Sequence, residues 1–117
     1  MFQAKMIDRQ NSASLHDQVA ADIRRAIAEG EANPGEKLPP ARDLAAVLGV
    51  HTNTVLRALR MLRDEGILEL TRGRGIYVTG AARQKSVVIS RAQELVTIAR
   101  REGYRREELV RLIEGLA

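Results

Sequence analysis

The sequence of 117 residues has no cysteine, no tryptophan, one phenylalanine and two tyrosines. The absence of cysteine excludes disulfides and thiolate chemistry, which is compatible with a reducing compartment. Proteins that hold single-stranded nucleic acid stack its bases on aromatic side chains, and this chain has too few for that mode of binding. If the chain binds a nucleic acid, its composition therefore favours duplex DNA.

Long apolar runs are missing as well. No segment approaches the ~18 consecutive apolar residues that cross a membrane. The N-terminal segment also lacks the basic and then apolar pattern of a secretion signal. We therefore expect no association with a membrane and a cytoplasmic location.

Residue groupings typical of catalysis are also missing. The two histidines, His16 and His51, fall on separate predicted elements. Neither belongs to a grouping of Asp, Glu or Cys that suggests a metal site or a catalytic triad. We expect no enzymatic activity, no metal and no cofactor, and we interpret His16 as a partly exposed packing residue.

What the chain does have is an excess of positive charge. Its 19 Lys and Arg outnumber 15 Asp and Glu, for a net charge of +4. The excess is concentrated between residues 37 and 75, where the basic residues are Lys37, Arg42, Arg57, Arg60, Arg63, Arg72 and Arg74. This distribution favours an anionic partner.

Apolar periodicity predicts a first helix from Ser14 to Gly30. Ser14 and Asp17 resemble a capping box at its start. Its core-facing residues recur every four positions and are Leu15, Val19, Ile23 and Ile27. The next segment, "EANPGEKLPP", contains a Pro-Gly pair and ends in two prolines, so we interpret it as a loop.

Two further helices are predicted at about 40–48 and about 52–65, and they meet at Gly49. We expect the first of them to turn Leu44, Val47 and Leu48 toward the core. The second has an apolar face made of Val55, Ala58, Leu59 and Leu62. Its opposite face carries Asn53, Arg57, Arg60 and Asp64.

Strand-like runs flank a turn with two glycines over about 67–79, which predicts a hairpin with the basic tip Arg72–Gly75. After Gly80, the polar segment "AARQKS" predicts a short hinge. Apolar stripes then predict a helix up to Gly103 and a second one over 105–116. The expected fold class is mainly α with a small β-hairpin: a winged helix-turn-helix domain at 12–80 and a helical segment at 84–117.

Small polar side chains open the second helix of the helix-turn-helix: His51, Thr52, Asn53 and Thr54. In this motif such residues meet base edges in the major groove, where Asn can bind adenine and Arg can bind guanine. The same cluster is also typical of ordinary helix capping, with His51 or Thr52 as the N-cap. The basic hairpin that follows favours DNA recognition, because it adds a further basic element to the same surface.

Residues 15–78 resemble the winged helix-turn-helix domain of GntR-type bacterial transcription regulators. The resemblance is carried, in this order, by "LHDQVAADIRRAIAEG", "NPGEKLPPARDLAAVLGV" and "NTVLRALRMLRDEGILELTRGRGIYV". The C-terminal "GYRREELVRLI" segment is similar to that of the YtrA-like subgroup, in which a short helical pair replaces a larger effector domain. The resemblance implies a transcription regulator, most often a repressor of its own operon and frequently of transporter genes.

For individual residues, the resemblance implies DNA contacts from both helices of the motif and from the wing. These residues are Arg42, His51, Thr52, Asn53, Thr54, Arg57, Arg72, Gly73, Arg74 and Gly75. The chain departs from the family pattern at Pro40-Ala41, where Ser-Glu is usual, and at Thr52, where Arg or Pro is frequent. Leu56 also departs, and it either touches a thymine methyl group or packs beneath the wing.

The two C-terminal helices are too short to cover both apolar stripes by packing on each other. We expect them to pair with a second copy of the chain, and docking on their own winged domain is the alternative. The expected dimer residues are Val88, Ala92, Leu95, Val96, Ala99, Leu109, Leu112, Ile113 and Leu116. A dimer would read a palindromic operator in double-stranded DNA with half-sites ~34–36 Å apart.

The sequence therefore predicts a homodimeric, sequence-specific DNA-binding regulator. One alternative is an architectural DNA-binding protein without sequence preference. A module that binds another protein is a second alternative, which the polar cluster and the basic hairpin disfavour. The operator sequence, the regulated genes, the choice between repression and activation and the existence of a small-molecule effector stay open.

Overall fold

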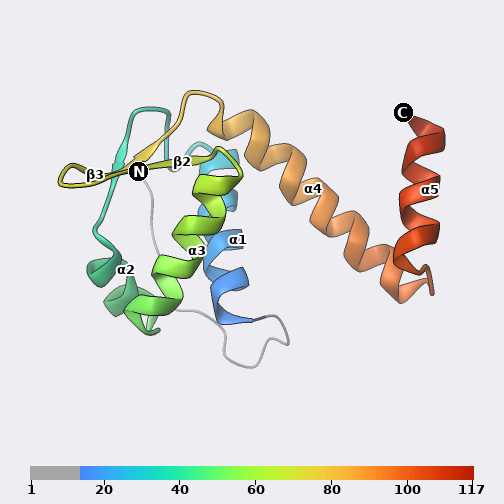
Figure 1. The fold of residues 1–117 in the computed structure, drawn as a ribbon, viewed down its shortest axis with the longest axis horizontal. Helices are drawn as coiled ribbons and strands as arrows, with labels where there is room; N and C mark the ends of the chain where they lie inside the picture. Colours follow the sequence, from blue (N-terminus) through green and yellow to red (C-terminus); the bar gives the residue numbers. More distant parts are fainter. Residues whose placement is uncertain (1–13) are drawn as a thin grey trace. The chain divides into compact units, whose positions relative to one another are not determined.

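The computed structural model describes residues 14–117. It is mainly helical with a three-stranded antiparallel sheet, which confirms the predicted fold class (Figure 1). The elements are α1 (Leu15–Ala28), β1 (Lys37–Leu38), α2 (Ala41–Leu48), α3 (Thr52–Asp64), β2 (Leu68–Thr71), β3 (Gly75–Val78), α4 (Ala82–Arg101) and α5 (Arg106–Leu116). The chain divides into two compact units, and the second begins at Val88, within α4.

The start of α1 is capped as the sequence predicts. The Ser14 hydroxyl accepts a hydrogen bond from the backbone N–H of Asp17 at 3.3 Å and donates one to the Asp17 carboxylate at 2.7 Å. Val19, Ile23 and Ile27 are fully buried, so the predicted stripe forms the core-facing side of the helix. The buried side of α1 is the surface on which α3 packs.

Helix α3 packs on α1 through the predicted apolar face, because Val55, Ala58, Leu59 and Leu62 are all buried. A buried ion pair joins the same two helices. Arg24 of α1 is only 1% exposed, and its Nε donates to Oε1 of Glu65, just after α3, at 2.8 Å. Its Nη2 donates to the other carboxylate oxygen, so the contact is bidentate.

Helix α2 corrects one sequence expectation. It buries Leu44, Ala45 and Leu48, whereas Val47, which was expected to face the core, is 53% exposed. At about 3.6 residues per turn, a stripe centred on Leu44, Ala45 and Leu48 leaves Val47 near the solvent-facing side. Gly49 then ends the helix with φ +73°, a left-handed conformation that turns the chain sharply into α3.

The wing contains the predicted hairpin of β2 and β3, joined by Arg72–Arg74. A third strand, β1, lies in the segment that was predicted to be a loop. It pairs antiparallel with β3, so the strand order is β1-β3-β2, and Leu38 is buried. A strand of two residues is too short to show alternation in the sequence, and only the pairing with β3 reveals it.

Gly75 lies beside the side chain of Lys37, which belongs to β1. It opens β3 with φ +121°, a conformation that side chains rarely allow. A Cβ atom built at this position would lie 2.7 Å from Cε of Lys37, which extends from β1. The glycine therefore lets the Lys37 side chain lie close to the tip of the wing.

The start of α4 corrects a second expectation. Residues 82–86 are helical, although "AARQKS" was predicted to be a hinge. Ala82 and Ser86 are both fully buried, one helical turn apart, so this end of α4 is anchored in the first unit. Their small side chains carry too weak an apolar signal to reveal this from sequence.

The ion pair generates the first prediction. Glu65→Ala leaves the Arg24 guanidinium buried without this carboxylate. Urea unfolding should show a loss of about 1.5–3 kcal/mol in the free energy of unfolding, below the ~3–5 kcal/mol of a fully buried pair. The smaller figure applies because the Glu65 side chain is 25% exposed.

Asp64→Ala is the matched control, because Asp64 pairs with Arg63 on the exposed side of α3. Exposed ion pairs contribute ~0–1 kcal/mol. An equal loss of stability in both variants would show that the Arg24–Glu65 pair has no special role.

The wing generates the second prediction. Gly75→Ala forces a side chain into an unfavourable φ and displaces the end of Lys37. The expected loss is about 1–3 kcal/mol in the free energy of unfolding. Gly80→Ala serves as the control, since a Cβ there meets nothing within 4 Å, and it should change stability by no more than ~0.5 kcal/mol. Two equally stable variants would contradict the strain argument.

Candidate nucleic-acid interface

The N-terminal end of α3 carries the polar cluster that the sequence singles out. His51 is the N-cap residue, but its side chain makes no capping hydrogen bond. The backbone closes the turn instead, because the carbonyl of His51 accepts from the N–H groups of Thr54 at 3.0 Å and Val55 at 3.3 Å. His51, Thr52 and Asn53 are exposed and Thr54 is half-buried. Side-chain capping, the alternative considered above, therefore does not account for this cluster.

Two arginines continue this exposed face along α3. Arg57 and Arg60 follow Asn53 at intervals of four and three residues, so the three side chains lie on one side of the helix. Within residues 14–117, neither guanidinium forms an ion pair. Arg63, in contrast, pairs with Asp64 at 3.1 Å. The face that is left with unneutralised positive charge is the one opposite the buried stripe.

The wing tip adds more positive charge. Arg72, Gly73 and Arg74 are exposed, and the turn is held by hydrogen bonds from Arg74 N–H to the Thr71 carbonyl at 3.0 Å and from the Tyr77 hydroxyl to the Arg74 carbonyl at 3.3 Å. Both bonds use backbone atoms of Arg74. Its guanidinium and that of Arg72 make no ion pair in the part of the chain that the structure describes.

Lys37 is a cation of this surface that sequence reasoning did not assign to the site. It lies opposite Tyr77 in the β1–β3 pair, and its side chain runs past Gly75. The sequence counts it among the basic residues but gives no sign that it belongs to the wing. Only the strand pairing brings it to the hairpin.

Arg42 lies at the start of α2, where it is exposed and forms no ion pair with residues 14–117. In the view of Figure 1, α2, the first turn of α3 and the wing tip lie along one edge of the first unit. These three elements carry the residues that the sequence assigns to DNA contact. The three elements combine exposed cations that form no ion pair within residues 14–117 with small polar side chains at the start of α3.

His16, the other histidine of the chain, lies at the start of α1. The half-buried His16 lies 3.4 Å from the Ser14 hydroxyl and 3.6 Å from the Asp17 carboxylate through its Nε2. Among residues 14–117, no three His, Cys, Asp or Glu side chains gather closely enough to hold a metal ion. Over the same residues, no helix has the length and apolar character needed to cross a bilayer.

The residues expected to form a dimer lie in the second unit, and most of them are exposed. Val88 is 68% and Leu116 is 78% exposed, and Leu95, Leu112 and Ile113 are also exposed. Ala92 is exposed, Val96 and Leu109 are half-buried, and Ala99 is buried. Of the residues that the structure describes, none in α5 is buried. The apolar faces of the second unit thus remain largely uncovered in the single chain.

Comparison with known proteins identifies the family of this fold. The family described as bacterial regulatory proteins, gntR family, matches residues 15–78. The HTH-type transcriptional repressor YtrA of Bacillus subtilis is 29% identical over an alignment of 117 residues. The alignment covers 95% of this chain and 90% of the repressor. The agreement over nearly the whole length confirms the resemblance to the YtrA-like subgroup.

Solved structures agree with this assignment. The structure of YtrA from Sulfolobus acidocaldarius, a GntR-family transcription factor, is 35% identical and has a TM-score of 0.62, covering 79% of this chain and 99% of that one. The DNA-binding domain of AraR in complex with the operator ORX1 is 26% identical with a TM-score of 0.59, covering 66% of this chain and 99% of that one. The chain therefore belongs to the gntR family of bacterial regulatory proteins, a family of DNA-binding transcription regulators.

Proposed function

We propose that this protein binds a specific operator in double-stranded DNA as a homodimer and represses transcription. The observation that carries the proposal is the exposed start of α3, where polar side chains face solvent without serving as caps. A helix fits the major groove, and the first residues of a recognition helix are the ones that reach base edges. The operator complex of the similar AraR domain supports DNA as the partner.

Base recognition falls to the exposed face of α3. Asn53 is suited to bind adenine through its amide, and Arg57 to bind guanine through its guanidinium. The short side chains of Thr52 and Thr54 let the backbone approach the groove, and His51 precedes them as the N-cap residue. The positive end of the helix dipole at the same place favours nearby phosphates.

Phosphate contacts fall to the residues around α3. Arg42, Arg72 and Arg74 are exposed cations without acidic partners in residues 14–117, and Lys37 joins them through β1. Gly73 and Gly75 have no side chains, so the tip of the wing can approach the backbone of the duplex closely. Such contacts fix the register of the protein on DNA and make its affinity depend on salt.

The second unit supports a dimer. Val88, Leu95, Leu112, Ile113 and Leu116 expose apolar surface that a second copy would cover. A symmetric pair places two recognition helices on a palindromic operator with half-sites ~34–36 Å apart. Repression of its own operon, including transporter genes, follows from the subgroup resemblance, and the B. subtilis relative is named a transcriptional repressor.

The base contacts generate the third prediction. Selection of bound duplexes from a random pool identifies the operator, and binding is then measured on it and on random duplex. Arg57→Ala should weaken operator binding by about 1–3 kcal/mol and relax the preference at one base position. Arg63→Ala, which removes the same charge from an ion-paired arginine of α3, should cost less.

Arg74, in the wing, provides a comparison with Arg57 because we expect it to contact phosphates rather than bases. Arg74→Ala should weaken binding to every duplex and reduce the salt dependence by about one unit of slope. An Arg57→Ala loss that is equal on operator and random duplex would favour the architectural alternative. A random pool that yields no preferred sequence would overturn the proposed specificity.

The dimer generates the fourth prediction. Leu112→Asp should dissociate the dimer, because it places an unpaired charge in an apolar interface. Light scattering measures the mass directly. Arg111→Gln is the control, since it lowers the net charge by the same amount from a polar position of α5. A Leu112→Asp protein that remains dimeric would place Leu112 outside the interface.

A further inference from the structure

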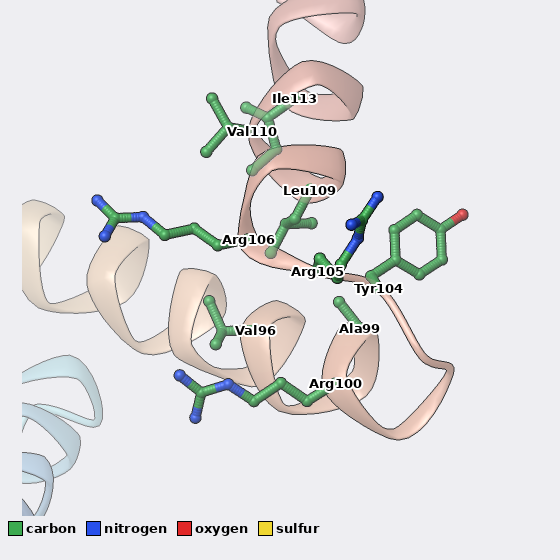
Figure 2. Close-up of a pocket in the computed structure, with 9 residues that line it drawn as sticks. All are labelled: Val96, Ala99, Arg100, Tyr104, Arg105, Arg106, Leu109, Val110 and Ile113. Atoms are coloured by element: carbon green, nitrogen blue, oxygen red, sulfur yellow. The ribbon is translucent and has the colours of Figure 1, made fainter.

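Leu56 of α3 is the residue for which the sequence leaves two roles open, a contact with DNA or packing beneath the wing. Most of the large apolar side chains that residues 14–117 expose lie on α4 and α5, Val110 and Ile113 among them (Figure 2). We expect a second copy of the chain to cover that surface. Leu56 belongs instead to α3, the helix proposed to bind DNA, so its apolar surface needs a separate explanation.

The spacing along α3 places Leu56 on the same side of the helix as the exposed residues Asn53, Arg57 and Arg60. Counted from Asn53, the four residues occupy positions i, i+3, i+4 and i+7. A helix in the major groove contacts base edges with side chains at this spacing. Leu56 is the apolar member of the set.

Burial distinguishes Leu56 from the core residues of the same helix. Val55, Ala58, Leu59 and Leu62 are 0–1% exposed, whereas Leu56 is half-buried. A leucine packed wholly beneath the wing would be as inaccessible as those four. Neighbouring side chains thus cover part of Leu56 and leave part of it accessible to a partner.

We propose that Leu56 contacts the 5-methyl group of a thymine in each half-site of the operator. Among the groups that bases present in the major groove, this methyl group is the apolar one, and it favours an apolar side chain. The contact removes both the methyl group and part of the leucine from water. The inference rests on the proposed function, because it requires the exposed face of α3 to lie in the major groove.

Asn53 limits where this thymine can lie. Leu56 follows Asn53 by three residues, which is a rise of about 4.5 Å along the helix. Successive base pairs are about 3.4 Å apart. The thymine is therefore expected to pair with the adenine proposed to bind Asn53, or to lie within about two base pairs of it.

The test compares thymine with uracil, which forms the same pair with adenine but lacks the 5-methyl group. Selection from a random pool gives the operator, and each thymine of one half-site is then replaced by uracil in turn. Fluorescence anisotropy measures the affinity of the full chain for each duplex. We expect one position at which uracil weakens binding by about three- to fivefold, the loss that corresponds to one methyl group.

Leu56→Ala should abolish this discrimination, so that the variant binds the thymine and uracil duplexes equally. Any loss of stability in the variant lowers the affinity for both duplexes alike and leaves their ratio unchanged. Met61→Ala is the matched control, because Met61 is also a half-buried apolar residue of α3 but falls outside the i, i+3, i+4 and i+7 set. This control should keep the three- to fivefold preference for thymine.

Three results would overturn this inference alone. A selected half-site without thymine, or one in which uracil replaces every thymine without loss, would leave packing as the role of Leu56. A Leu56→Ala protein that still prefers thymine at the same position would assign the methyl contact to another side chain. A random pool that yields no preferred sequence would instead overturn the proposed function, and this inference with it.

Discussion

The packing of α3 against α1 is the constraint on which the rest of the first unit depends. Buried apolar residues and the Arg24–Glu65 pair fix both the rotation and the C-terminal end of α3. A helix held by one face must present the opposite face to solvent, so Asn53 and Arg57 are exposed because Val55 and Leu59 are buried. The buried interaction thus determines which side chains are available to a partner.

Much of this architecture could be predicted from the sequence, for a physical reason. Helices that bury one face carry an apolar period over three or four turns, and α1 and α3 follow that period closely. Where the signal is short or weak, prediction was wrong. Val47 is apolar but exposed, β1 is only two residues long, and the start of α4 is anchored by Ala82 and Ser86 rather than by large side chains.

Prediction from the sequence is limited in the same way for the charged side chains of the candidate site. Arg24 and Arg57 are both helical arginines, and local sequence does not show that one is buried against a carboxylate 41 residues away while the other lacks an ion-pair partner in residues 14–117. The exposed start of α3 and the wing tip could be predicted because they lie within single motifs. Lys37 could not, since its place beside the wing depends on a pairing between distant strands.

That pairing has a consequence for how the wing tolerates change. The Lys37 side chain of β1 reaches position 75 of β3, although the two positions are 38 apart in the chain. Any side chain at position 75 would have to displace the end of the lysine, so one substitution would alter both the backbone of the hairpin and the position of a cation. Two remote segments thus supply the positive charge near the wing tip, and a side chain at position 75 would move the cation that β1 contributes.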